Sequence, residues 1–460
     1  MTLSFAHNSD VAIPATGVSS ENWDSFRDRL PPSTQAWAKV NGFNGALGQV
    51  LKIQSPEGAL SSILFGFGTP GARARGRFHI AGLASGLPKG IYALDGDFGN
   101  PEEAATAWLL AGYFFDRYKP QKSNLAKLAP ISGVDSHRIE IIANAAALAQ
   151  DLINTPASDM GPDALETAFR ELGDQHKATV SVVKGDDLLK ENFPMIHAVG
   201  RASDQAPRLL DLTWGRADAP KVTLVGKGVC FDTGGLNIKP GNSMGLMKKD
   251  MGGAANTIAL AQMIMSAKLD VRLRLLVPAV ENSISAGAFR PGDILMSRKG
   301  LTVEINNTDA EGRLVLGDAL ALADEESPAK LYCMATLTGA ARVALGPDLP
   351  PFYTDSDEMA EALEKAAQKV ADPLWRMPFW TPYEGMIEPG IADIDNAPSG
   401  GFAGSITAAL FLKRFVENAK EFAHFDIYGW TPAAKPARPK GGACQGARAI
   451  FEALDAEYGG

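Results

Sequence analysis

The sequence predicts an α/β protein with a small N-terminal α/β domain and a larger C-terminal α/β domain, the latter built on a central, mostly parallel sheet flanked by helices. The 460 residues exceed what one compact core usually organises, which indicates two domains. Strand-length apolar runs alternate with helical patterns through the second part of the chain, as in βαβ units. The runs Val222–Val225 and Leu273–Val277 are unbroken, as expected of parallel strands buried on both faces.

The N-terminal α/β domain is predicted to span residues 1–133. Its strands are expected at Gly45–Ile53, Ser61–Phe67 and Phe78–Leu87. A helix is expected over Pro101–Tyr118, because Pro101 and two glutamates occupy what would be its first turn. The polar segment Lys119–Ser123 then marks a break ahead of the domain boundary. No constellation of reactive residues precedes this break.

The second domain is predicted to span residues 134–460. It begins with a linking helix over Ser136–Asn154, whose apolar residues recur at helical spacing and which stops before Thr155-Pro156. Its strands are expected at Ala178–Val183, Met195–Val199, Arg208–Thr213, Lys221–Val225, Val271–Val277, Leu331–Leu337 and Glu421–Ile427. Its further helices are expected at Pro162–Leu172, Asn256–Met265, Leu314–Glu325, Glu358–Ala371 and Gly404–Phe415.

The composition narrows the possible partners. A net charge of −9 and a pI near 5.3 argue against broad contact with nucleic acid or an anionic membrane surface. No apolar stretch approaches a transmembrane span, and no basic region followed by an apolar one opens the chain, so we expect a cytoplasmic protein. The cysteines Cys230, Cys333 and Cys444 are odd in number and lack metal-ligand spacing, so we interpret them as buried small hydrophobic residues.

One short stretch concentrates reactive side chains. Asp309, Glu311 and Arg313 occur within five residues, directly ahead of the apolar run 314–322. A structural interpretation is available, because Thr308 and Glu311 have the spacing of a capping box, which satisfies free backbone N–H groups at the start of a helix. Taken alone, this stretch does not require a function.

A second charged cluster upstream favours a functional interpretation. Lys227, Asp232, Lys239 and Asp250 are spread over a Gly-rich turn after a predicted strand and the start of a predicted helix. Taken singly, Asp250 could cap its helix and the lysines could be solvated or in surface ion pairs. If the fold brings Asp232 and Asp250 together with Asp309 and Glu311, however, the four carboxylates would repel one another and destabilise the fold. Two divalent cations would cancel these four negative charges, so the pattern predicts a metal site.

A serine hydrolase is the competing enzymatic hypothesis. Residues 241–245 match the Gly-x-Ser-x-Gly pattern with Ser243 as nucleophile, and His424 would have to serve as its base. That motif needs an apolar strand leading directly into it, and the segment 237–240 is not apolar. The six histidines include no His-x-x-x-His pair, which disfavours a histidine-rich zinc site.

Six stretches carry the motifs of the second domain: Asp151–Pro156, Val225–Gly228, Phe231–Gly235, Met247–Ala255, Asn307–Leu314 and Ala335–Ala340. Together with Lys239, they resemble the leucyl aminopeptidases, a family of two-metal cytosolic exopeptidases. The resemblance covers roughly the last two-thirds of the chain, whereas the first third resembles the family only in length and position. One departure is Thr233, which stands where the family often has serine and keeps the hydroxyl.

The resemblance implies two divalent metal ions per subunit, which could be zinc, manganese or magnesium. Asp232 and Glu311 would bridge both ions, and Asp309 would hold one of them, partly through its backbone carbonyl. Lys227 and Asp250 would hold the other ion. A lysine that binds a metal ion must be neutral, and only a cation bound directly to its nitrogen would lower the lysine pKa far enough.

The resemblance also implies the chemistry. The ion pair would activate a hydroxide that attacks the peptide carbonyl, and Lys239 would stabilise the resulting oxyanion. Arg313 would hold a bicarbonate that acts as general base. Substrate contacts are implied at Met247, Thr336, Leu337 and Gly339. The implied substrates are peptides with a free N-terminus and a leucine-like first residue, and the implied assembly is a homohexamer.

A non-enzymatic alternative belongs to a different class of function. Some relatives of this family also carry a DNA-binding or regulatory role. A basic stripe in the first domain would support that role here, but the charges of this region are mixed.

Overall fold

The computed structural model describes residues 2–7, 12–120 and 126–459, and its chain divides into two compact units. The first runs to Ala147 and includes Ala433–Lys440, and the second comprises Leu148–Pro432 and the residues from Gly441 onward. The division falls within helix α6 (Ser136–Asn154), which has the predicted bounds. The predicted domain boundary before this helix stays a prediction, and residues 121–123 of the predicted polar break lie outside the described residues.

The first unit is built on a five-stranded sheet with the order β2-β3-β1-β4-β5, in which β2 and β3 are antiparallel and the other neighbours are parallel. Its strands are β1 (Ile13–Ser19), β2 (Val50–Gln54), β3 (Leu60–Gly68), β4 (Gly90–Gly96) and β5 (Ala126–Leu128). Its helices are α1 (Trp23–Arg27), α2 (Pro32–Val40), α3 (Pro70–Arg73), α4 (Ala81–Gly86) and α5 (Pro101–Ala111).

The strand predicted at Phe78–Leu87 is wrong, because this segment contains helix α4. The alternation of small residues suggested a strand. The buried residues Ile80, Leu83 and Leu87, however, recur at spacings of three and four, which is the helical period.

Two element ends in the first unit also differ from the prediction. The strand expected from Gly45 begins only at Val50, because positive φ angles at Gly45 (76°) and Gly48 (83°) form a turn. Helix α5 ends at Ala111 and not at Tyr118, and Gly112 follows at its C-cap.

The second unit is built on a nine-stranded sheet with the order β15-β14-β17-β13-β8-β10-β7-β6, and β9 also pairs with β10. Most of its neighbouring strands are parallel. The strands of this sheet are β6 (Thr179–Lys184), β7 (Arg208–Trp214), β8 (Lys221–Gly226), β9 (Gly228–Asp232), β10 (Arg272–Asn282), β13 (Lys330–Ala335), β14 (Pro351–Tyr353), β15 (Trp375–Met377) and β17 (Glu421–Asp426). Two small sheets contain β11 (Ile294–Met296), β12 (Thr302–Glu304) and β16 (Ile394–Asp395), and β18 (Trp430–Thr431) and β19 (Gly441–Gly442).

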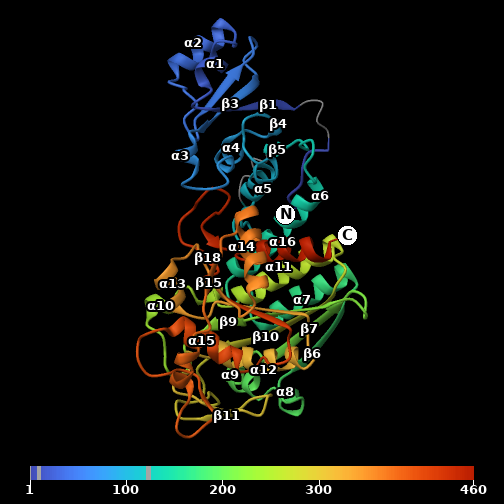
Figure 1. Cartoon of the computed structure of the whole chain (residues 1–460), viewed down its shortest axis with the longest axis vertical. Coiled ribbons are helices and arrows are strands. Elements are labelled where there is room, and N and C mark those ends of the chain that lie inside the picture. Colours follow the sequence, from blue (N-terminus) through green and yellow to red (C-terminus); the bar gives the residue numbers. More distant parts are fainter. Residues whose placement is uncertain (1, 8–11, 121–125, 460) are drawn as a thin grey trace. The chain divides into compact units, whose positions relative to one another are not determined.

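Helices cover both faces of this sheet (Figure 1). Helix α11 packs on β8 with α7 and α16 beside it, and helix α12 packs on β8 from the other face with α9 and α15 beside it. The helices of the second unit, apart from α6, are α7 (Pro162–His176), α8 (Asp187–Lys190), α9 (Pro194–Gly200), α10 (Gly241–Met244), α11 (Gly252–Ala267), α12 (Gly312–Asp324), α13 (Gly339–Leu345), α14 (Asp357–Lys369), α15 (Gly404–Lys413), α16 (Ala447–Tyr458) and the 3₁₀ helices η1 (Met247–Lys249) and η2 (Thr381–Ile387). Within the described ranges, no helix has both the length and the apolar character needed to span a membrane.

The strand predicted at Met195–Val199 is wrong, because this segment lies in helix α9. Pro194 occupies the first turn, where its missing N–H costs nothing. The buried Asp318 of α12 then accepts hydrogen bonds from the backbone N–H groups of Met195 and Ile196, at 2.8 and 3.3 Å. A partner distant in sequence therefore stabilises the start of a helix that its own apolar residues do not distinguish from a strand.

Four parallel strands bring reactive residues to one edge of the sheet. Strands β8, β9, β10 and β13 run parallel, so their carboxyl ends meet there. Strand β8 leads into Lys227, β9 ends at Asp232, β10 ends at Asn282 and Thr336 follows β13. Ligands of open α/β sheets bind at this edge.

Candidate metal centre

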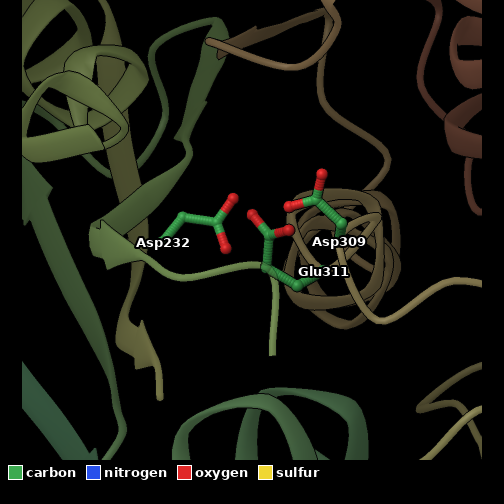
Figure 2. A group of neighbouring side chains, drawn as sticks. All are labelled: Asp232, Asp309 and Glu311. Atoms are coloured by element: carbon green, nitrogen blue, oxygen red, sulfur yellow. The ribbon is translucent and has the colours of Figure 1, made fainter. Parts of the chain in front are cut away.

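Three carboxylates converge where these strands end. Asp232 is the last residue of β9, and Asp309 and Glu311 lie in the loop that leads into α12. Each offers an oxygen atom, and the three oxygens lie within 4.8 Å of one another. Figure 2 shows the three side chains turned toward one another, with the carboxylate of Glu311 between the other two.

Two lysines bridge the carboxylates in pairs. The Nζ atom of Lys227 lies 2.7 Å from Oδ2 of Asp250 and 2.9 Å from Oε1 of Glu311. The Nζ atom of Lys239 lies 2.8 Å from Oδ2 of Asp232 and 2.5 Å from Oδ1 of Asp309. The two ammonium groups thus provide part of the positive charge that the four carboxylates require.

The pKa shifts show that this compensation is incomplete. Burial and the charge of Asp232 raise the pKa of Glu311 to about 8, and the same two causes raise that of Asp309 to about 6. Burial also acts to raise the pKa of Asp250, but the charge of Lys227 outweighs it and the pKa is lowered. Without further cations, Glu311 therefore retains a proton at neutral pH, where a glutamate in water would be ionised, and Asp309 ionises only at a higher pH than in water. Additional cations fit this site.

Neighbouring groups hold the carboxylates in place. Asn282 donates from Nδ2 to Oδ1 of Asp232 at 2.9 Å, and the backbone N–H of Gly234 donates to the same oxygen at 2.9 Å. Thr336 donates from Oγ1 to Oδ1 of Asp250 at 2.8 Å. Such supporting hydrogen bonds orient ligand groups before a metal binds.

Gly312 lets the loop approach Lys227 closely. A Cβ atom at Gly312 would lie 2.4 Å from Cε of Lys227, a distance that real Cβ atoms do not adopt. A side chain between Glu311 and Arg313 would therefore displace the end of Lys227 from its position beside Glu311.

The capping-box interpretation of Thr308 and Glu311 is wrong. Helix α12 begins at Gly312 with Glu311 at the N-cap position, and no side-chain capping hydrogen bond forms. Thr308 donates from Oγ1 to the carbonyl of Gly234 at 2.6 Å and accepts from the backbone N–H of Asn237 at 2.8 Å. Its hydroxyl therefore joins the loop after β9 to the loop before α12. Nor does Asp250 cap α11, because Met251 occupies that position.

Arg313 lies in the first turn of α12 and is 9% exposed. Within the described ranges, its Nε and Nη1 atoms have no hydrogen-bond partner. Burial lowers its pKa to about 10. Its guanidinium lies 5.8 Å from the ring of Phe411. A buried guanidinium with free donors suits an anion, because its planar fork matches a carboxylate or carbonate group.

Asp232 and Asp309 of the cluster line a cavity of about 500 Å³. The residues predicted to contact metal or substrate that line it are Lys227, Asp232, Lys239, Met247, Asp250, Asp309, Thr336, Leu337 and Gly339. Neither Glu311 nor Arg313 is among the lining residues, but Glu311 forms an ion pair with Lys227, which is one of them.

Sequence reasoning missed further lining residues, among them the charged Lys249 and Arg342 and the aromatic Tyr428. Lys249 is 6% exposed, so it is not a solvated surface charge. Its position directly before Asp250 was the available signal. Arg342 and Tyr428 lie outside the short charged clusters, so nothing local distinguished them.

The arrangement does not fit a serine hydrolase. Ser243 lines the cavity, but it lies in the short helix α10, which follows a loop and not a strand. His424 lies in strand β17, is 0% exposed and has its pKa lowered to about 3 by burial. It is not among the residues that line the cavity.

Comparisons with known proteins agree with this geometry. The profile of the cytosol aminopeptidase family, catalytic domain, matches residues 147–451, and that of the M17 aminopeptidase N-terminal domain matches residues 13–130. A probable cytosol aminopeptidase from Syntrophotalea carbinolica is 39% identical over 76% of this chain and 73% of its own length.

Solved structures extend the likeness to the whole chain. The crystal structure of a cytosol aminopeptidase from Coxiella burnetii has a TM-score of 0.93 and 43% identity, covering 98% of each chain. The bottromycin maturation enzyme BotP in complex with Mn has a TM-score of 0.86 and 30% identity, covering 97% of this chain and 100% of its own. These relatives support neither the serine hydrolase nor the DNA-binding alternative. The chain belongs to the cytosol aminopeptidase family and is a metal-dependent aminopeptidase.

Proposed function

We propose that this aminopeptidase works with two divalent metal ions held by the carboxylate cluster. The observation that carries the proposal is the convergence of Asp232, Asp309 and Glu311 within 4.8 Å, with raised pKa values for two of them. Asp232, Asp309 and Glu311, together with Asp250 and Lys227, would hold the ions. When bound, the ions would supply an activated water as nucleophile and polarise the peptide carbonyl.

Lys239 and Arg313 have separate roles in this proposal. Lys239 lines the cavity beside Asp232 and Asp309, where its ammonium group would stabilise the oxyanion that forms on the substrate carbonyl. Arg313 would hold a bicarbonate through its free Nε and Nη1 donors, and this anion would accept the proton of the attacking water. The described residues that line the cavity include no histidine to serve as the base.

The substrates of this mechanism are peptides with a free N-terminus. Their α-amine would dock at the cluster, and Leu246, Met247, Leu337 and Ile427 give the cavity apolar surface for a leucine-like first side chain. Zinc, manganese and magnesium all suit carboxylate ligands, and the manganese complex of BotP supports manganese. The names of the relatives support a cytoplasmic enzyme. The homohexamer and the assignment of activity to residues 134–460 rest on family analogy.

Metal removal and reconstitution test the proposal. Extended chelation of the purified protein should abolish hydrolysis of leucyl-aminomethylcoumarin, and Mn²⁺ or Zn²⁺ should restore it with two ions bound per chain. Full activity in protein shown by elemental analysis to be metal-free would refute the mechanism. Light scattering at working concentration would separately reveal whether the enzyme is a hexamer.

A further inference from the structure

The cavity contains a second charged feature, away from the carboxylate cluster. Lys249 and Arg342 both line the cavity and both contact the aromatic ring of Tyr428. The Nζ atom of Lys249 lies 4.7 Å from the ring centroid, and the guanidinium carbon of Arg342 lies 5.3 Å from it. We call these three residues the basic wall.

In the part of the chain that the structure describes, the two cations of the basic wall have no anion of their own. Within the described residues, neither Lys249 nor Arg342 forms an ion pair. The carboxylate of Asp250, next to Lys249 in the chain, is bonded to Lys227 and Thr336. Exposed lysines need no partner, but Lys249 is 6% exposed, and burying an unpaired cation is costly.

Asp426, whose charge also acts on Lys249, is already bonded as well. Asp426 accepts hydrogen bonds from the backbone N–H groups of Leu337 and Thr338 and from the hydroxyl groups of Thr338 and Ser405. Its carboxylate oxygens therefore have little capacity left to accept a hydrogen bond from Lys249. A cation–π contact with Tyr428 remains, which stabilises a cation less than an ion pair does and does not replace a carboxylate.

The charged residues that line the cavity also indicate that the basic wall lacks an anion. Its lining carries four cationic side chains, Lys227, Lys239, Lys249 and Arg342, and three carboxylates, Asp232, Asp250 and Asp309, and the fourth carboxylate, Glu311, is paired with Lys227 behind the lining. With metal ions on the carboxylates, the basic wall would face the substrate with its positive charge uncompensated. Electrostatic attraction in such a confined site favours an anionic ligand group.

We propose that the basic wall binds a carboxylate of the peptide substrate, so that the enzyme selects peptides with an acidic group near the bond that is cleaved. This inference rests on the proposed function, because the substrate amine must dock at the carboxylate cluster. The carboxylate has two possible sources: the side chain of a first-position glutamate or aspartate, and the C-terminus of a dipeptide. The apolar lining formed by Leu246, Met247 and Ile427 would accommodate the methylene groups of a glutamate as it does those of a leucine.

Matched substrates test the side-chain source in the metal-loaded enzyme. Glutamyl- and glutaminyl-aminomethylcoumarin have nearly the same shape and differ in one charge. A charge-assisted contact contributes about 1.5–3 kcal/mol, so we expect kcat/KM for the glutamyl substrate to exceed that for the glutaminyl substrate by about 10- to 100-fold. The substitutions Lys249→Met and Arg342→Met should each reduce this ratio.

Lys248→Met is the matched control. Lys248 is the neighbouring lysine, but its Nζ atom donates to the backbone carbonyl of Asn154 and it does not line the cavity. Its removal should leave the ratio of the two substrates unchanged. Equal loss of the ratio in all three variants would indicate a general structural effect and would overturn the inference.

The dipeptide Leu-Gly and its C-terminal amide test the second source. If the basic wall binds the C-terminus, kcat/KM should be about 10- to 100-fold higher for the free acid, and the same two substitutions should remove the difference. Ratios near one for both pairs in the wild-type enzyme, or high ratios that survive both substitutions, would overturn the inference. Metal-dependent hydrolysis of leucyl-aminomethylcoumarin in the same preparation reports on the proposed function, so the two failures are distinguishable.

Discussion

The substitution Glu311→Gln should stabilise the metal-free protein while abolishing metal binding and turnover. Glu311 is 1% exposed, and its pKa is raised from 4.5 to about 8 by burial and by the charge of Asp232. Glutamine keeps the shape of the side chain and removes the charge. Lys227 would lose one partner but keep Asp250, at 2.7 Å.

The sign and size of the effect follow from the shifted pKa. A carboxyl group whose pKa is higher in the folded than in the unfolded state costs no stability below pH 4.5, where both states are protonated. Above that pH the unfolded state releases its proton more readily, so stability falls as the pH rises toward 8. At pH 7 the cost is of order 3 kcal/mol. Removing the charge should therefore raise the Tm of the metal-free protein by a few degrees.

Thermal unfolding with and without metal tests this reasoning. In chelator at pH 7, the Glu311→Gln variant should melt above the wild type, and the difference should shrink toward pH 4.5. With added Mn²⁺ the order should reverse, because the wild type alone gains stability from bound metal. A variant that melts lower than the wild type in chelator, or that keeps metal-dependent activity, would refute the account of Glu311.

Three further substitutions separate chemistry from stability. Arg313→Ala should keep the metals and bind substrate as before, but kcat should fall by about 10²–10⁴-fold and lose its dependence on bicarbonate; unchanged kcat would contradict the base assignment. Lys239→Ala should lower kcat by roughly 10²–10³-fold with KM less affected, as steady-state kinetics would show. Glu166→Gln should lower the free energy of unfolding by about 1–3 kcal/mol, because Glu166 pairs with the fully buried Arg208 at 2.7 Å. Burial acts to raise the pKa of Glu166, but Arg208 lowers it overall. The destabilisation of the Glu166→Gln variant should therefore be present above about pH 4.5 and disappear as the pH falls further. Urea titrations at pH 7 and pH 3 test this, and an equal destabilisation at both pH values would contradict it.

The sequence was informative where a local pattern determines the structure. The apolar spacing of Ser136–Asn154 predicted helix α6 with its observed bounds. The charged clusters were spaced so that a parallel sheet would bring them together, and the carboxyl ends of β8 and β9 do so. In these cases the information lies in short stretches of the chain and in the general geometry of α/β folds.

Local patterns failed where the deciding partner is remote in sequence. Met195–Val199 has the composition of a strand, and the hydrogen bonds that hold its helix come from Asp318. Thr308 has the spacing of a capping residue, and its hydroxyl is bonded to the loop at Gly234. Lys249 could not be recognised as buried from its neighbours, because the ring that covers it belongs to Tyr428.

The lysines that bridge the carboxylates bear on when the enzyme acquires its metal. Small metal-binding domains stay unfolded until the ion arrives. Here Lys227 and Lys239 act as internal counterions, and the cluster stands at the edge of a sheet with a large apolar core of its own. The chain is therefore expected to fold without metal and to remain folded but inactive until metal binds. Added metal would then activate the protein, and Lys227 would release a proton if it becomes a ligand as proposed.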